Sequence, residues 1–157
     1  MPVPQIDPRG PRFNAALTAV VLAVVLLTAP GPIGLALLAA QTVLFGLGAA
    51  LGVQRTPAAY LFRTLIRPRL SPPAHTEDAR PPRFAQGVGL LFALVALIGY
   101  LADATVLGAV ATGLALAAAL LNAVFGFCLG CELYLLGQRL RPGRTTTNDT
   151  EKKEAFA

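Results

Sequence analysis

The only two cysteines of the chain stand at C-x-x-C spacing within FGFCLGCELY, residues 125–134. Two thiols at this spacing can form a disulfide, exchange electrons with another dithiol or carry sulfur. Glu132 follows directly and is the only glutamate within the long hydrophobic segments, where an acidic residue is costly and therefore usually functional. Cys128, Cys131 and Glu132 form a candidate thiol site. The alternatives are that the cysteines pack as small apolar residues and that Glu132 pairs with Arg139 or with an arginine of the loop.

The composition predicts that a membrane surrounds this site. Hydrophobic residues make up 55% of the 157 residues and charged residues 13%, with a mean hydropathy of +0.62, which excludes an ordinary soluble domain. Apolar runs without Lys, Arg or Glu approach or exceed the length of a membrane span at residues 13–29, 33–53, 84–101 and 106–131. We therefore expect an all-α fold, an integral membrane four-helix bundle.

The positive charges predict the orientation of this bundle. All 13 Lys and Arg lie before the first run, between the second and third, or after the fourth. By the positive-inside rule both termini and the central loop are cytoplasmic, so the chain is N-in and C-in. The net charge of +5 then reflects topology, and we expect no nucleic-acid partner. The cysteines face the reducing side, which argues against a permanent structural disulfide.

Two segments of the chain resemble each other. Residues 7–13 read DPRGPRF and residues 78–84 read DARPPRF, with five of seven positions identical. A Phe-Gly pair also occurs in both the second and the fourth run. We expect two parallel two-helix hairpin repeats related by an axis along the membrane normal. In this alignment Gly48 and Leu51 correspond to Cys128 and Cys131, so only the second hairpin carries thiols.

The chain then divides into segments of different character. A basic cytoplasmic loop links the two hairpins, and Thr56-Pro57 predicts that a helix begins within it. Arg63 and Arg67 lie one turn apart on that helix, on its membrane-surface side facing anionic head groups; the alternative is a docking surface for a cytoplasmic partner. The expected segments are an N-terminal segment 1–12, a first hairpin 13–53, the loop 54–83, a second hairpin 84–137 and a disordered cytoplasmic tail 138–157.

Arginines precede the first and third helices at the membrane boundary where the cysteines lie. Arg12 and Arg83, together with the helix amino ends, form a candidate anion-binding site. In this interpretation the cysteine pair closes the fourth helix and has Glu132 beside it, and both features oppose ionisation of the thiols. A break of the helix at Gly126 and Gly130 would change this. Two thiolates and one glutamate fall short of a metal site within one subunit, so we expect no metal and no cofactor, while a homo-oligomer stays open.

The motifs DPRGPRF, PPRFAQ and FGFCLGCELYLLGQR resemble a bacterial membrane family, domain of unknown function 4395, over roughly residues 7–140. The resemblance implies a bacterial source and a multi-pass protein of the inner (plasma) membrane. Genes of the family lie near sulfurtransferases or thioredoxin-like proteins in some genomes, which implies a partner of one of these kinds. The matching positions are the cysteine pair, Glu132 and the Arg-Phe helix entries.

We expect a cytoplasm-facing thiol site that handles electrons or sulfur, as persulfide or thiosulfate, with a soluble partner. Two alternatives stay open. One is a transporter or channel for a small solute or sulfur anion, and the other is a membrane anchor that recruits a cytoplasmic enzyme. Whether the protein is an enzyme is left open by these residues.

Overall fold

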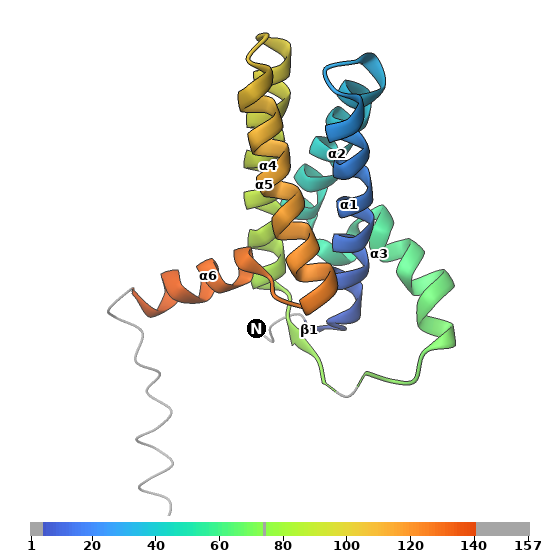
Figure 1. Cartoon of the computed structure of the whole chain (residues 1–157). Coiled ribbons are helices and arrows are strands. Elements are labelled where there is room, and N and C mark those ends of the chain that lie inside the picture. Colours follow the sequence, from blue (N-terminus) through green and yellow to red (C-terminus); the bar gives the residue numbers. More distant parts are fainter. Residues whose placement is uncertain (1–4, 74, 141–157) are drawn as a thin grey trace, which may run out of the picture.

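A computed structural model describes residues 5–73 and 75–140 of the chain (Figure 1). The predicted tail therefore lies mostly outside the described residues. Four helices are long and apolar enough to cross a membrane, as predicted: α1 (Arg9–Thr28), α2 (Pro32–Leu51), α4 (Arg80–Leu101), and α5 (Thr105–Leu120) with its π-helical continuation η4 (Leu121–Phe125). The fold is all-α apart from a two-stranded ribbon, and its long helices are those of a membrane protein.

The first helix of each pair begins about one turn before its apolar run, and an aspartate just before it binds the first N–H group of the helix. The Oδ1 atom of Asp7 accepts a hydrogen bond from the backbone N–H of Arg9 at 3.0 Å, and Oδ1 of Asp78 accepts from Arg80 N–H at 2.8 Å. Each carboxylate satisfies one of the free N–H groups at a helix start. The matching DxR segments thus stabilise the start of a helix in the same way in both halves of the chain.

The four long helices pack as a closed ring in which α1 and α4 each contact both α2 and α5. The core is built from large side chains of α1 and α2, such as Leu22 and Leu38, and from mostly small residues of α4 and α5, with Tyr100 as the large exception. A Cβ atom on Gly99 would lie 2.9 Å from the backbone nitrogen of Gly108, so α4 and α5 meet backbone to backbone.

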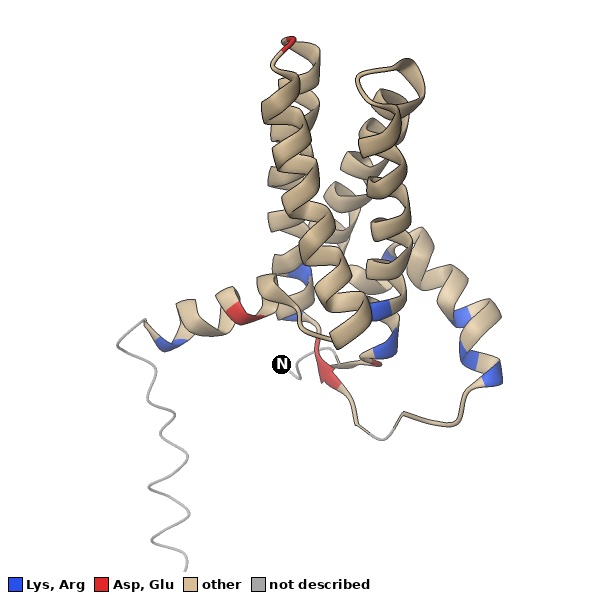
Figure 2. Ribbon diagram, in the orientation of Figure 1, with Lys and Arg blue, Asp and Glu red and all other residues tan. Residues whose placement is uncertain are grey.

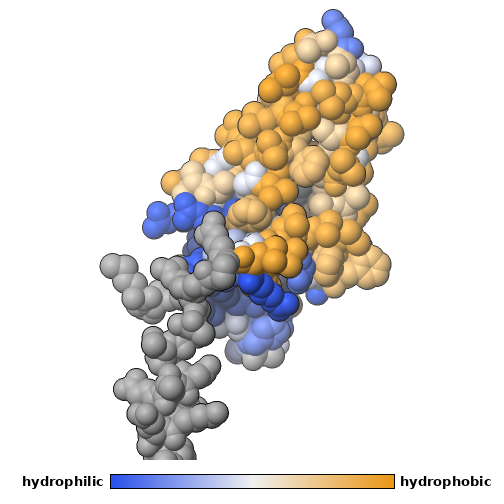
Figure 3. All heavy atoms as spheres, turned by 90° about the vertical axis from the view of Figure 1, so that its left-hand side faces the viewer, coloured by the Kyte–Doolittle hydropathy of each residue, from blue (hydrophilic) through white to orange (hydrophobic). Residues whose placement is uncertain are grey.

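The two ends of the bundle differ in chemistry. The short turns after α1 and α4 lie together at one end, while the N-terminal strand, the central loop and the last helix lie at the other (Figure 1). In the described chain the arginines gather at this second end, which we call the basic end (Figure 2). Hydrophobic side chains dominate the face of the bundle shown in Figure 3, and hydrophilic ones gather below it. This asymmetry is the one that the positive-inside argument uses.

A short antiparallel ribbon joins the two halves at the basic end. Strand β1 (Gln5–Ile6) pairs with β2 (Glu77–Asp78), with Gln5 opposite Asp78 and Ile6 opposite Glu77. Ile6 is buried with Val53 and Ala79 in a small second core. The ribbon therefore holds the entries of α1 and α4 beside each other.

The first part of the central loop, up to Arg69, is made of short helical segments. These are η1 (Val53–Arg55), α3 (Pro57–Leu61), η2 (Phe62–Ile66) and η3 (Arg67–Arg69). The predicted Thr56 cap is confirmed, since its Oγ1 accepts a hydrogen bond from Ala59 N–H at 3.2 Å. Phe62 is buried against Phe13 with ring centroids 5.8 Å apart. That contact fixes the segment from α3 to η3, which we call the loop helix, on the start of α1.

Candidate functional site

The sequence suggested that the fourth apolar run forms one helix through the cysteines. In the structure this helix is interrupted, because the chain turns at Gly126. This residue has φ of +69°, a left-handed conformation that favours glycine. The N–H groups of Gly126 and Phe127 donate to the carbonyls of Asn122 (3.0 Å) and Leu121 (3.3 Å), which satisfies the end of the helix. A separate helix, α6 (Leu129–Arg139), follows and runs across the bundle axis (Figure 1).

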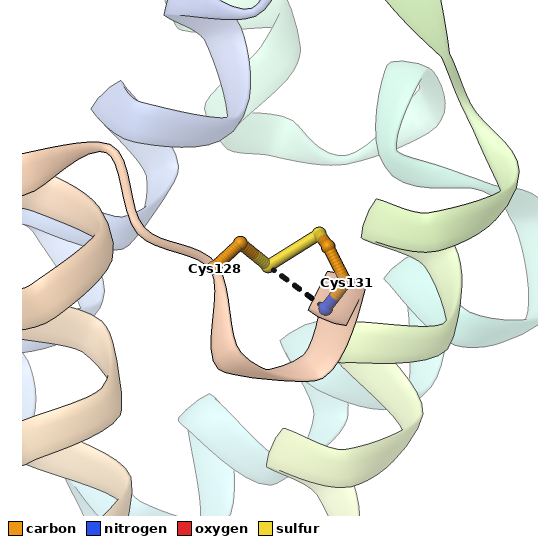
Figure 4. Close-up of a disulfide and its surroundings, with 2 residues drawn as sticks. All are labelled: Cys128 and Cys131. Carbon is orange, nitrogen blue, oxygen red and sulfur yellow. Dashed lines mark hydrogen bonds between the residues drawn. A yellow bond between two sulfur atoms is a disulfide. The ribbon is translucent and has the colours of Figure 1, made fainter. Parts of the chain in front are cut away.

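The cysteine pair therefore opens a helix rather than closing one. Cys128 is the N-cap of α6, and its Sγ atom accepts a hydrogen bond from the backbone N–H of Cys131 at 3.3 Å (Figure 4). The two sulfurs are joined as a disulfide across a Cα–Cα distance of 5.2 Å. Both residues are half-buried. Thiols at a helix amino end are favoured as thiolates, so the geometry removes one of the two objections that the sequence raised to reactivity. The other stays, because Glu132 follows Cys131 directly in the first turn of α6.

Glu132 lies in the first turn of α6 and is exposed. Its place differs from the expectation of an acid within a membrane span, because the apolar span ends at Phe125. Within residues 5–73 and 75–140 the one contact at salt-bridge distance is between His75 Nε2 and Glu77 Oε1 at 3.5 Å, so Glu132 does not pair with Arg139 or with an arginine of the loop there. A carboxylate in the first turn is favourable for the helix, which gives Glu132 a structural role beside the proposed chemical one.

Arg12 and Arg83 bind the carboxyl ends of helices from the opposite half of the chain. Nη2 of Arg12 donates to the carbonyls of Ala123 (3.4 Å) and Val124 (3.2 Å), at the end of the fourth span. Arg83 donates from Nε to Ala49 O at 2.7 Å and from Nη2 to Ala50 O at 2.8 Å, at the end of α2. These contacts give both arginines a structural task that the sequence did not reveal. Anion binding by the pair stays a prediction.

The start of α6 is pressed against α4. A Cβ atom on Gly130 would lie 2.6 Å from Cβ of Ala85, so only glycine allows this approach. One turn later the ring of Tyr134 packs on Phe84, with centroids 5.6 Å apart. The disulfide is thus placed by three features: the turn at Gly126, the Arg12 contact beside it and the crossing at Gly130.

Arg63 and Arg67 are exposed on the loop helix and line a cavity of about 260 Å³ beside the start of α1. Asn14 and Gln86 also line the cavity. Two amide side chains in otherwise apolar runs are a sequence signal that could have indicated this cavity. Within the described ranges no group of three or more His, Cys, Asp or Glu side chains is arranged to hold a metal ion.

A protein-family model matches most of the chain. The family model described as a domain of unknown function, DUF4395, matches residues 6–139. No curated protein and no solved structure matches the chain. The matched region contains the helix entries, the loop helix and the cysteine pair.

We predict that Gly126→Ala lowers the free energy of unfolding by about 1–2 kcal/mol, because a Cβ atom disfavours the left-handed conformation. The measurement is unfolding of the purified protein in mixed detergent, followed by circular dichroism. Gly113→Ala is the matched control, since Gly113 is helical and a Cβ there meets nothing within 4 Å. Equal stability of the two variants would contradict the prediction that the left-handed conformation at Gly126 requires glycine.

We also predict that loss of each arginine contact increases hydrogen–deuterium exchange in a different segment of the chain. Arg12→Gln removes a cap from the end of the fourth span and should increase exchange in residues 121–128 while leaving residues 47–53 unchanged. Arg83→Gln should show the reverse pattern, so each variant controls the other. Exchange that rises equally in both segments with either variant would contradict the crossed arrangement.

Proposed function

The chain belongs to the DUF4395 family, and we propose that it is a membrane-bound thiol–disulfide protein. In this proposal Cys128 and Cys131 exchange electrons or sulfur with a soluble partner. The partner is a dithiol protein of the thioredoxin kind or a sulfurtransferase. The lipid bilayer holds the site, and the partner approaches from the aqueous phase at the basic end.

The observation that carries the proposal is the position of the pair at the start of α6. The N-terminal cysteine of the pair is the helix N-cap and accepts the amide N–H of the second cysteine. Peptide dipoles of the helix favour negative charge at this position, and the thiolate is the reactive form in thiol–disulfide exchange. This supports Cys128 as the nucleophile and Cys131 as the resolving residue.

The exchange of electrons follows the ordinary two-step course. A thiolate of the partner attacks one sulfur of the disulfide, a mixed disulfide forms, and the other sulfur leaves as a thiolate. The second thiol of the partner then attacks the mixed disulfide and releases the reduced pair, so two electrons and two protons pass between the proteins. In the reverse direction the Cys128 thiolate attacks an oxidised partner.

The same pair can handle sulfur. The Cys128 thiolate attacks the terminal sulfur of a partner persulfide, which leaves a persulfide on Cys128 and a thiolate on the partner. Attack of Cys131 on the inner sulfur of Cys128 then forms the disulfide and releases hydrosulfide. The electron and sulfur versions share the nucleophile and differ in the donor.

We place the protein in the bacterial inner membrane with the basic end, both termini and the cysteines on the cytoplasmic side. Two features support this orientation: arginines gather at the basic end, and the short turns after α1 and α4 contain no Lys or Arg. A reducing cytoplasm then maintains a dithiol, and the disulfide forms during turnover.

We further propose that the chain is a duplication in which each unit has three helices rather than two. Thr56 and Cys128 both cap a short helix and accept the N–H three residues later. Phe62 and Tyr134, each six residues after its cap, pack on Phe13 and Phe84. This register aligns the cysteines with Thr56 and Ala59 instead of Gly48 and Leu51. The Ile6–Glu77 pairing of equivalent residues supports a two-fold axis between the units.

The proposal predicts different behaviour for the two single cysteine variants. Cys131→Ser should form a stable mixed disulfide through Cys128 with an oxidised dithiol probe protein, because the resolving thiol is missing. The Cys128 thiol in this variant should also react with iodoacetamide about fivefold faster than the Cys131 thiol in Cys128→Ser, as about 1 kcal/mol from the helix end allows. Mass spectrometry of the peptide from both variants measures the adduct and the rate.

The double Cys→Ser variant is the control for background labelling. Equal alkylation rates and no trapped complex in either single variant would contradict a redox role for the pair. In cells, a double variant that fully restores the sulfur or redox phenotype of a deletion strain would also contradict a redox role. That result would favour transport or anchoring.

A further inference from the structure

Helix α6 carries a row of exposed leucines that no other part of the described chain covers. The exposed fraction is 40% for Leu129, 54% for Leu133, 52% for Leu136 and 72% for Leu140. The spacing of four, three and four residues places these side chains on one face of the helix, within about 60° of each other at about 100° per residue. We call them the leucine stripe.

The rest of α6 explains why the stripe is left uncovered. Gly130 and Tyr134 lie on the side of the helix that packs on α4, and from Leu135 onward every described residue is exposed. The helix therefore touches the bundle only near its start and then projects sideways from it (Figure 1). An exposed row of leucines on such a projecting helix would be unfavourable in water.

The surface next to this junction is suited to lipid. A shallow hollow between α4 and α6 is lined by Phe84, Val88, Leu91 and Tyr134, and by Arg80 and Arg83. Apolar side chains beside two arginines match an acyl chain and an anionic head group. The exposed apolar surface of the spanning helix α4, with Leu91 at 61%, thus continues toward α6.

We propose that α6 lies in the surface of the bilayer that its neighbours span, with the leucine stripe among the upper acyl chains. An amphipathic helix with a face of leucines binds in this way. Leu135, also 40% exposed, is the one leucine of α6 that lies off this face. The occupant of the stripe is the lipid leaflet at the basic end. This inference is independent of the thiol chemistry and would hold if the cysteines were inert.

The arrangement assigns a side to the disulfide. At about 100° per residue, Cys131 and Gln138 lie opposite the leucine stripe on α6. With the stripe in the leaflet, Cys131 faces water at the level of the head groups. A partner must then reach the sulfurs along the membrane surface rather than from within the lipid.

Tryptophan fluorescence tests the placement, because the chain contains no tryptophan. The full-length variants Leu136→Trp and Gln138→Trp are reconstituted into vesicles whose phospholipids carry bromine on the acyl chains. We expect the Trp at position 136 to emit at shorter wavelength and to be quenched about threefold or more relative to the Trp at position 138, which faces water. Leu133→Trp is the second stripe variant, in case position 136 does not tolerate the larger ring.

Equal quenching at the stripe and at position 138 would overturn the proposal. So would a short-wavelength emission at the stripe without quenching by bromine, since protein, such as a second copy of the chain, would then cover the leucines. The measurement does not involve the thiols, so its outcome is separate from that of the cysteine variants.

Discussion

Backbone carbonyls at the end of a membrane-spanning helix need partners, because lipid offers none and water is only just within reach. In this protein the partners come from across the bundle. Arg12 at the start of the first span binds the end of the fourth, and Arg83 at the start of the third binds the end of the second. Each contact joins the two halves of the chain, so the same two guanidinium groups satisfy helix ends and link the halves of the closed ring.

The position of the cysteines follows from this constraint. With the carbonyls of Ala123 and Val124 bound, the fourth span ends, Gly126 turns the chain, and a new helix begins at Cys128. A continuous helix would have placed the same thiols at a negative helix end, where a thiolate is disfavoured. The chemical character of the pair therefore depends on a turn two residues earlier.

The spans, their helical class and the caps at Thr56 were predictable from apolar length and local capping rules. For the fourth run the sequence left open a break at Gly126 and Gly130 but could not decide it. Phe45-Gly46 and Phe125-Gly126 read alike, yet Gly46 lies within α2 and Gly126 is left-handed. The difference arises from contacts distant in sequence, with Arg12 beside Gly126 and Ala85 against Gly130. The pairing of β1 with β2 was also beyond prediction, since two-residue strands carry almost no signal of their own.

The Arg12 contact also has a meaning for the order in which the protein is assembled in the membrane. Arg12 is made near the beginning of synthesis, and its acceptors at residues 123 and 124 emerge more than a hundred residues later. Strand β1 likewise waits for residues 77 and 78. The first two helices can enter the bilayer early, but their charged entry acquires its partners only when the last span is inserted. Closure of the ring and correct placement of the cysteine helix are therefore both late events of biogenesis, and a chain that stalls before the fourth span has neither.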